Sequence, residues 1–135
     1  MNKGPSEDIL QQHCFQWFRL QYPDRIIYHV PNGGKRNYLE AVKFKRMGVV
    51  AGVPDLVIPE PTQEYHGLYI ELKANKNKPT ANQRTMIEQL ASRGYRVEVC
   101  NEFEQFKRVV KGYFEGRMKF TLYMTQKEFE EKFSN

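Results

Sequence analysis

The spacing of hydrophobic residues switches between helical and strand periods along most of the chain, which predicts a mixed α/β fold. Helical spacing covers 6–20, 38–47, 80–93 and 102–114. Strand-like runs lie between these segments, at 25–30, 53–58, 68–73 and 95–100. The second and third runs are separated by a turn, so we expect them to form a hairpin. The predicted order is α-β-α-β-β-α-β-α around a small central sheet.

Polar residues at the predicted helix ends agree with these boundaries. Asn37 precedes the second helix, and Thr80 with Gln83 has the spacing of a capping box. Within 38–47 we expect a buried face formed by Leu39, Val42 and Met47. Beyond residue 116 the sequence predicts an extended piece and a last helix, which either cover the core or form a dimer contact.

Length and composition indicate one globular domain over 1–135, with a core of about 6–115 and a C-terminal extension of about 116–135. Hydrophobic residues make up 40% and charged residues 27%, which excludes wholesale disorder. Cys14 and Cys100 lack the spacing of a zinc or redox site, so we expect two reduced thiols. The N-terminus has no apolar core and no run reaches the ~20 residues of a membrane helix. We therefore expect a soluble, cytoplasmic protein without a membrane partner.

The charges are unevenly distributed within a net charge of +5. No Lys or Arg occurs between Met47 and Leu72, whereas the flanks are basic. An acidic centre with basic flanks is what a metal site acting on a polyanion would require, although chance segregation gives the same pattern. The flanking cations are Lys35, Arg36, Lys43, Lys45 and Arg46 before this stretch, and Lys73, Lys76, Lys78 and Arg84 after it.

The strongest chemical signal is Pro54-Asp55 followed, after fifteen residues, by Glu71-Leu72-Lys73. Side chains alternate along a strand, so Glu71 and Lys73 lie on one face, and a hairpin can bring Asp55 beside Glu71. Two adjacent carboxylates repel each other unless a cation lies between them, and Mg²⁺ prefers oxygen ligands. The pattern therefore predicts a metal site in which Lys73 orients water or stabilises charge on a phosphate. A turn residue and a solvated cross-strand pair are the simpler interpretations.

At these residues the chain resembles the PD-(D/E)XK nucleases, and the context of Gly52 and Gln83 resembles their VRR-NUC branch over about 6–115. The resemblance implies an αβββαβ restriction-endonuclease-like core, dependence on Mg²⁺ or Mn²⁺, and hydrolysis of DNA phosphodiesters. By position, it implies Asp55, Glu71, Lys73 and Gln83 as catalytic residues. It implies four metal ligands, which are Glu7, Asp55, Glu71 and the backbone carbonyl of Leu72. For Glu7 an ordinary charge in a first helical turn is the alternative.

Two basic segments are candidate contacts to the DNA backbone. The first is the glycine loop that holds Asn32, Gly33, Lys35 and Arg36, and the alternative there is an ordinary turn. The second holds Lys76 and Lys78, for which a solvated loop is the alternative. We interpret the aromatic residues as core rather than base-stacking groups; these are Trp17, Tyr22, Tyr28 and Tyr38.

The function that these signals predict is a metal-dependent DNA endonuclease. The compact length resembles stand-alone viral and bacterial family members, which implies a homodimer that cuts branched DNA such as four-way (Holliday) junctions. Two alternatives stay open: a non-catalytic DNA-binding module, and a nuclease that acts on flaps or ordinary duplex. A sequence-specific restriction-type enzyme is disfavoured because no large recognition insertion is visible.

Overall fold

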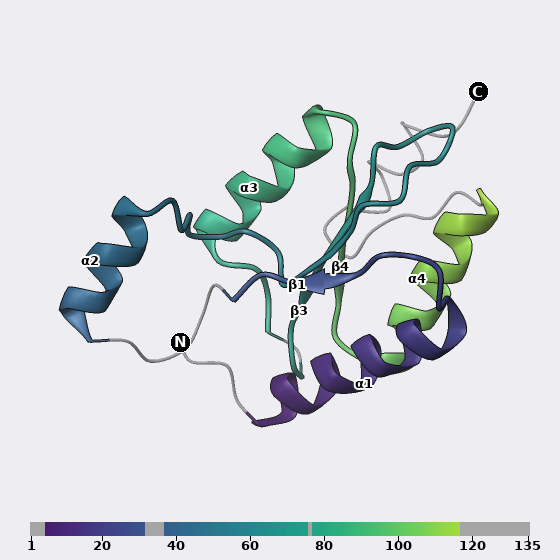
Figure 1. Ribbon diagram of the computed structural model, residues 1–135, viewed down its shortest axis with the longest axis horizontal. Coiled ribbons are helices and arrows are strands. Elements are labelled where there is room, and N and C mark those ends of the chain that lie inside the picture. The colour runs from purple at the N-terminus through teal and green to yellow at the C-terminus, as the bar shows by residue number, and fades with distance from the viewer. Residues whose placement is uncertain (1–4, 32–36, 76, 117–135) are drawn as a thin grey trace.

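The computed structural model describes residues 5–31, 37–75 and 77–116 and shows a four-stranded mixed sheet between helices (Figure 1). The helices are α1 (Pro5–Gln21), α2 (Tyr38–Arg46), α3 (Ala81–Ser92) and α4 (Phe103–Glu115). The strands are β1 (Tyr28–His29), β2 (Leu56–Ile58), β3 (Leu68–Leu72) and β4 (Arg96–Cys100). With α2 inserted after β1 and α4 added at the end, this is the predicted αβββαβ core.

The sheet has the order β1-β2-β3-β4. The β1–β2 and β2–β3 pairs are antiparallel, which confirms the predicted hairpin, and the β3–β4 pair is parallel. A parallel pair needs a crossover connection, and α3 supplies it. Leu56 pairs with Ile70, and this register sets the position of the acidic residues described below.

Helices cover both faces of the sheet (Figure 1). One face packs against α1 and α4 through a core that includes Phe18, Ile70 and Phe106. The other face packs against α3, where Ile87 contacts Val97 and Val99. Because side chains alternate along β3, Ile70 and Leu72 enter the first core and Glu71 faces α3.

The capping predictions are confirmed, but β3 and β4 are each one residue shorter than predicted, and β1 and β2 are shorter by more. Asn37 accepts the Glu40 N–H at 2.8 Å, and Thr80 and Gln83 form a complete capping box. Strand β1 spans two residues rather than 25–30, because the Glu60 carboxylate takes the Ile26 N–H. Strand β2 begins at Leu56 rather than at residue 53, since a proline at position 54 has no N–H to donate to a ladder.

The predicted buried face of α2 is wrong. Leu39 is 78% exposed and Met47 is 68% exposed, and Val42 is only half-buried. The helix stands away from the sheet (Figure 1), and none of its residues is buried. The helical spacing identified the helix correctly but could not show how far its apolar residues are exposed.

The two cysteines are free and buried, as expected of reduced thiols. Burial raises the pKa of Cys14 to about 12 and holds that of Cys100 well above its usual value. Neither thiol is therefore a nucleophile near neutral pH. In the parts of the chain that the structure describes, every helix is too short or too polar to cross a membrane. The extension predicted after residue 116 lies outside the described residues.

Candidate active site

Asp55 and Glu71 face each other at the end of the β2–β3 hairpin. The register pairs Leu56 with Ile70, and continuing it by one residue places Asp55 opposite Glu71. Residues directly opposite on antiparallel strands have Cβ atoms about 5 Å apart. Asp55 is 7% exposed and Glu71 is 3% exposed, so both carboxylates are shielded from water. The structure therefore brings the two acids together, as predicted.

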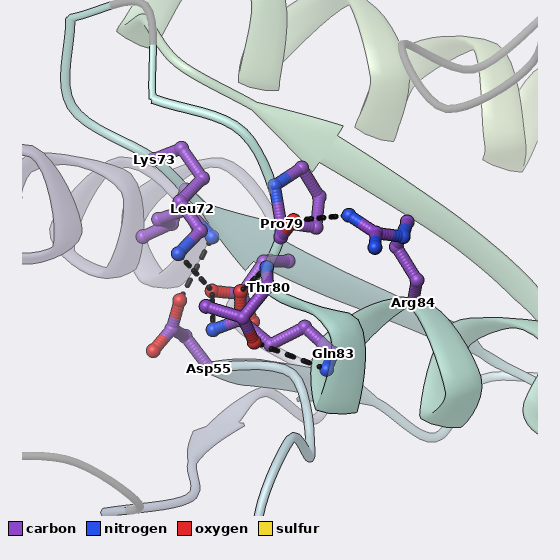
Figure 2. A network of polar contacts seen from close by, with 8 residues as sticks. Asp55, Leu72, Lys73, Pro79, Thr80, Gln83 and Arg84 are labelled. Atoms are coloured by element: carbon purple, nitrogen blue, oxygen red, sulfur yellow. Dashed lines mark hydrogen bonds and ion pairs between the residues drawn. The ribbon is translucent and has the colours of Figure 1, made fainter. Parts of the chain in front are cut away.

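Three polar contacts hold Asp55, although the residue lies just outside the hydrogen-bonded pairs of β2 and β3. Its Oδ2 accepts the backbone N–H of Leu72 at 2.8 Å (Figure 2). Its backbone carbonyl accepts the N–H of Val30 at 2.9 Å, and His29 Nδ1 lies 2.8 Å from the same oxygen. These contacts fix both the main chain and one carboxylate oxygen of Asp55. The side chain is thus oriented before any ligand binds.

Glu71 is tied to the first turn of α3. Gln83 Nε2 donates to Glu71 Oε2 at 3.1 Å, while Gln83 Oε1 accepts the Thr80 N–H at 2.8 Å. The amide oxygen is used by the capping box, so the amide nitrogen is directed at the carboxylate. Figure 2 shows Gln83 reaching from α3 toward the region of Asp55. The predicted association of Gln83 with the site is therefore present as a direct contact.

Lys73 supplies the positive charge of the site. Its Nζ lies 4.0 Å from Glu71 Oε2, and its side chain is 13% exposed. Because it lies two residues after Glu71, it emerges on the same face. The backbone N–H of Lys73 donates to the Cys100 carbonyl at 2.9 Å, which anchors its main chain to β4. Asp55, Glu71, Lys73 and Gln83 thus converge as predicted.

Gly52 allows the loop that carries Asp55 to lie against α3. Its φ is +89°, and a Cβ at this position would lie 2.5 Å from the Asn82 carbonyl oxygen and 3.1 Å from Gln83 N. A side chain here would separate the Asp55 loop from the helix that holds Gln83. This close approach was not predicted, although a glycine three residues before Asp55 was the available signal.

The described residues provide two clustered acids rather than three. Across 5–31, 37–75 and 77–116 no three His, Cys, Asp or Glu side chains are close enough together to hold one ion. Glu7 is buried on α1, at 8% exposure, but it does not join Asp55 and Glu71 in such a group. Its role as a metal ligand stays a prediction. His29 was not assigned to the site from the sequence, because only its ring contact to Asp55 reveals it.

The donor set nevertheless fits a hard divalent cation. Two buried carboxylates directly opposite each other are unfavourable without a positive charge between them. Lys73 Nζ lies 4.0 Å from Glu71 Oε2, at the outer limit of an ion pair. Residue 54 lies opposite Leu72 in the same register and, being proline, donates no ladder hydrogen bond to the Leu72 carbonyl. Oxygen atoms of this kind are the ligands that Mg²⁺ and Mn²⁺ prefer.

The predicted DNA contacts are only partly within the described chain. Asn32, Gly33, Lys35, Arg36 and Lys76 lie outside the described residues. Lys78 is exposed in the loop before α3, where a cation can meet a phosphate. Among the aromatic residues, Trp17 and Tyr22 pack against the core as predicted. Tyr28, 48% exposed, and Tyr38, 80% exposed, are not core residues, because β1 is an edge strand and no residue of α2 is buried.

Comparison with known proteins agrees with this geometry. The model of the VRR-NUC domain family matches residues 2–103. A solved structure titled "VRR_NUC domain protein" is 34% identical and covers 84% of this chain and 91% of its own, with a TM-score of 0.68. A second solved structure, titled "VRR_NUC domain", is 20% identical and covers 82% of this chain and 99% of its own. Its TM-score of 0.57 shows that it shares the fold. No curated protein matches.

The family match includes every residue of the candidate site and ends at the start of α4. It spans well over half of the 135 residues. The chain therefore belongs to the VRR-NUC domain family of nuclease-type, DNA-binding domains.

Proposed function

We propose that this protein is a divalent-metal-dependent DNA endonuclease whose site is formed by Asp55, Glu71 and Lys73. The observation that carries the proposal is the opposition of two buried carboxylates with an ammonium 4.0 Å from one of them. A cation bound between the two carboxylates would relieve their mutual repulsion. A purely DNA-binding module has no use for buried acids, since they oppose the binding of a polyanion.

Asp55, Glu71 and the Leu72 carbonyl would hold the ion, and Glu7 would be a further ligand. A bound Mg²⁺ or Mn²⁺ supplies Lewis-acid polarisation of the phosphate and lowers the pKa of water. The Leu72 N–H keeps Asp55 in place, and Gln83 does the same for Glu71. Lys73 orients the attacking water and stabilises charge that develops on the phosphate. Water adds to phosphorus, the bond to the 3′ oxygen breaks, and the products carry a 5′ phosphate and a 3′ hydroxyl.

The preferred substrate in this proposal is branched DNA, cut by a homodimer. Four large apolar side chains at or next to α2 support the dimer because they are half or more exposed: Tyr38, Leu39, Met47 and Val50. Burying these exposed side chains against a second copy would remove their apolar surface from water. A two-fold dimer would present two sites to the two equivalent strands of a four-way junction.

One substrate panel tests the activity and its geometry together. Purified protein is incubated with four-way junctions, flaps, linear duplex and single strands, in Mg²⁺, in Mn²⁺ and in EDTA. We expect metal-dependent cutting that is fastest on branched DNA. Equal rates on every substrate would remove the branched-DNA preference, and no cleavage under any condition would remove the nuclease proposal. Light scattering of the wild-type protein and of the Leu39→Glu variant tests the dimer. We expect the mass of a dimer for wild type and the mass of a monomer for the variant.

A further inference from the structure

Two tyrosines lie on the same face of the sheet as the acids of the candidate active site. The register aligns four residues in one row across the strands, which are Tyr28, Val57, Tyr69 and Val97. Asp55 is two residues before the β2 member of this row, and Glu71 is two residues after the β3 member. Because side chains alternate along a strand, the row projects from the face that carries Asp55 and Glu71. Two residues of a strand span about 6.6 Å, so the row is the next one on that face.

The phenols at this row are near one another. The rings of Tyr69 and Tyr95 are 5.3 Å apart and meet edge to face. Burial raises the pKa of Tyr69, and the neighbouring phenols of Tyr95 and Tyr28 raise it further. The effect of Tyr28 on Tyr69 agrees with the register, which places both side chains on one face. Tyr69 is therefore an uncharged hydrogen-bond donor near neutral pH.

This face of the sheet is covered over β4 and accessible at β1. Helix α3 packs on Val97 and Val99 of β4 (Figure 1). Tyr28 is 48% exposed, and Ile26 just before β1 is 54% exposed. A DNA strand held at the acids is therefore kept from β4 by α3 and can pass over β1 and β2 instead. The Glu60 carboxylate, which accepts the Ile26 N–H at 2.8 Å, bounds this surface because it repels a phosphate.

We propose that the hydroxyl groups of Tyr28 and Tyr69 donate hydrogen bonds to phosphates of the cleaved strand, within about two nucleotides of the scissile phosphate. The inference rests on the proposed nuclease function and adds a substrate-binding surface to it. Tyrosine is among the residues that contact DNA phosphates, and such contacts fix the register of a protein on DNA. One nucleotide advances a duplex strand by about 3.4 Å, so the distance between the two rows corresponds to about two nucleotides. The surface thus sets where the cut falls, without any sequence preference.

A binding cycle between tyrosine variants and modified DNA tests these contacts without requiring cleavage. Phosphates around the branch point of a flap are replaced one at a time by uncharged methylphosphonates, and affinities are measured by fluorescence anisotropy in EDTA. The variants are Tyr28→Phe and Tyr69→Phe, which remove only a hydroxyl group and keep the ring. Tyr65→Phe is the matched control, because Tyr65 packs against the core on the opposite face of the sheet.

We expect Tyr28→Phe and Tyr69→Phe each to bind the unmodified flap about tenfold more weakly than wild type, the effect of losing one hydrogen bond to a charged group. Methylphosphonate at the contacted position should weaken binding by wild type and by Tyr65→Phe about as much. It should change the affinity of the corresponding hydroxyl variant by less than about twofold, because that contact is already absent. The salt dependence of binding to unmodified DNA should be equal in all four proteins, since no cation is removed.

The proposal is overturned if either hydroxyl variant binds like wild type, or if it keeps the wild-type sensitivity to every methylphosphonate. It is also overturned if Tyr28→Phe loses affinity only together with a change in the mass of the protein in solution, because an edge strand such as β1 can instead bind a second chain. Absence of cleavage on every substrate would contradict the nuclease proposal alone, because the binding cycle is measured without catalysis.

Discussion

Gln83 connects Glu71 to the start of α3 by a pair of hydrogen bonds from one side chain. Its nitrogen donates to Glu71 Oε2 at 3.1 Å and its oxygen accepts the Thr80 N–H at 2.8 Å. The N3 residue of a capping box ordinarily only accepts a backbone N–H at the start of its helix. Here the same residue also orients an acid of the site. The stability of the helix start and the position of Glu71 are consequently linked.

Two substitutions of Gln83 test these roles. Gln83→Glu keeps an oxygen for the Thr80 N–H but replaces the N–H donor to Glu71 by a second carboxylate oxygen. We expect a loss of cleavage of about 10- to 100-fold, as for other residues that orient metal ligands, and a lower thermal stability from the repulsion between the two carboxylates. Gln83→Ala should lose both activity and roughly 1 kcal/mol of stability. Cleavage rates and thermal melts measure the two effects, and full activity in Gln83→Glu would show that the contact to Glu71 is not needed.

Gly52 and Gly48 form a matched pair for testing the close approach to α3. Both have positive φ, +89° and +107°, but only Gly52 has backbone atoms of Asn82 within 3 Å of an added Cβ. Alanine at either position should therefore destabilise the protein by about 1 kcal/mol through backbone strain. Only Gly52→Ala should also displace the Asp55 loop from Gln83.

The measurement for this pair is the cleavage rate at a temperature where both variants are fully folded. We predict a clear loss of activity in Gly52→Ala and little in Gly48→Ala. Equal activity in the two variants would show that the contact between the loop and α3 does not position the site.

Lys73 and Lys78 allow a test of catalytic against electrostatic roles. Lys73 Nζ lies 4.0 Å from Glu71, whereas Lys78 is exposed in the loop before α3. Lys73→Met should lower the rate of single-turnover cleavage by roughly 100-fold or more, the usual effect of removing one group that stabilises the transition state. Lys78→Met should instead weaken DNA binding modestly and reduce its salt dependence. A loss of cleavage rate in Lys78→Met with only weaker DNA binding in Lys73→Met would instead assign the catalytic role to Lys78.

The buried phenol and thiol groups predict loss of stability at high pH. Burial raises the pKa of Tyr113 and of Cys14, each to about 12. In the unfolded chain these groups lose their protons near pH 10 and pH 9, so the native state holds more protons between those values and pH 12. The free energy of unfolding should be unaffected below pH 9 by these groups and fall progressively up to pH 12. Urea unfolding from pH 8 to 11 measures this.

Tyr113→Phe provides the control for the alkaline transition. The variant loses the hydrogen bond from its hydroxyl to the Glu60 carbonyl and is therefore less stable at neutral pH. Its stability should nevertheless fall less steeply with pH than that of wild type. An identical slope would assign the alkaline loss to other groups.

Local sequence patterns predicted most of the elements because the determinants lie within each element. The capping box at Thr80 and the strand period of β4 are set by neighbouring residues, and both elements form, although all five residues of β4 are buried. The same patterns overestimated the length of β1, since the partner of the Ile26 N–H is Glu60, 34 residues away. They also placed Leu39 and Met47 in the core, because spacing alone does not show whether anything covers a helix.

The candidate site was predictable where a strand period fixes direction. Glu71 and Lys73 lie on one face for that reason, and the hairpin places Asp55 opposite Glu71. The contacts that orient the two acids could not be predicted from the sequence. The His29 contact to Asp55 joins residues 26 apart, and the close approach of Gly52 to Asn82 depends on how α3 packs.

The most direct test is a comparison of wild type with Asp55→Asn in cleavage and in DNA binding. The substitution keeps an oxygen that accepts the Leu72 N–H, so the fold should be retained, while the negative charge facing Glu71 is removed. We predict that Asp55→Asn binds DNA at least as tightly as wild type but shows no cleavage in Mg²⁺ or Mn²⁺. Metal-dependent cleavage by Asp55→Asn at the wild-type rate would contradict the assignment of the site.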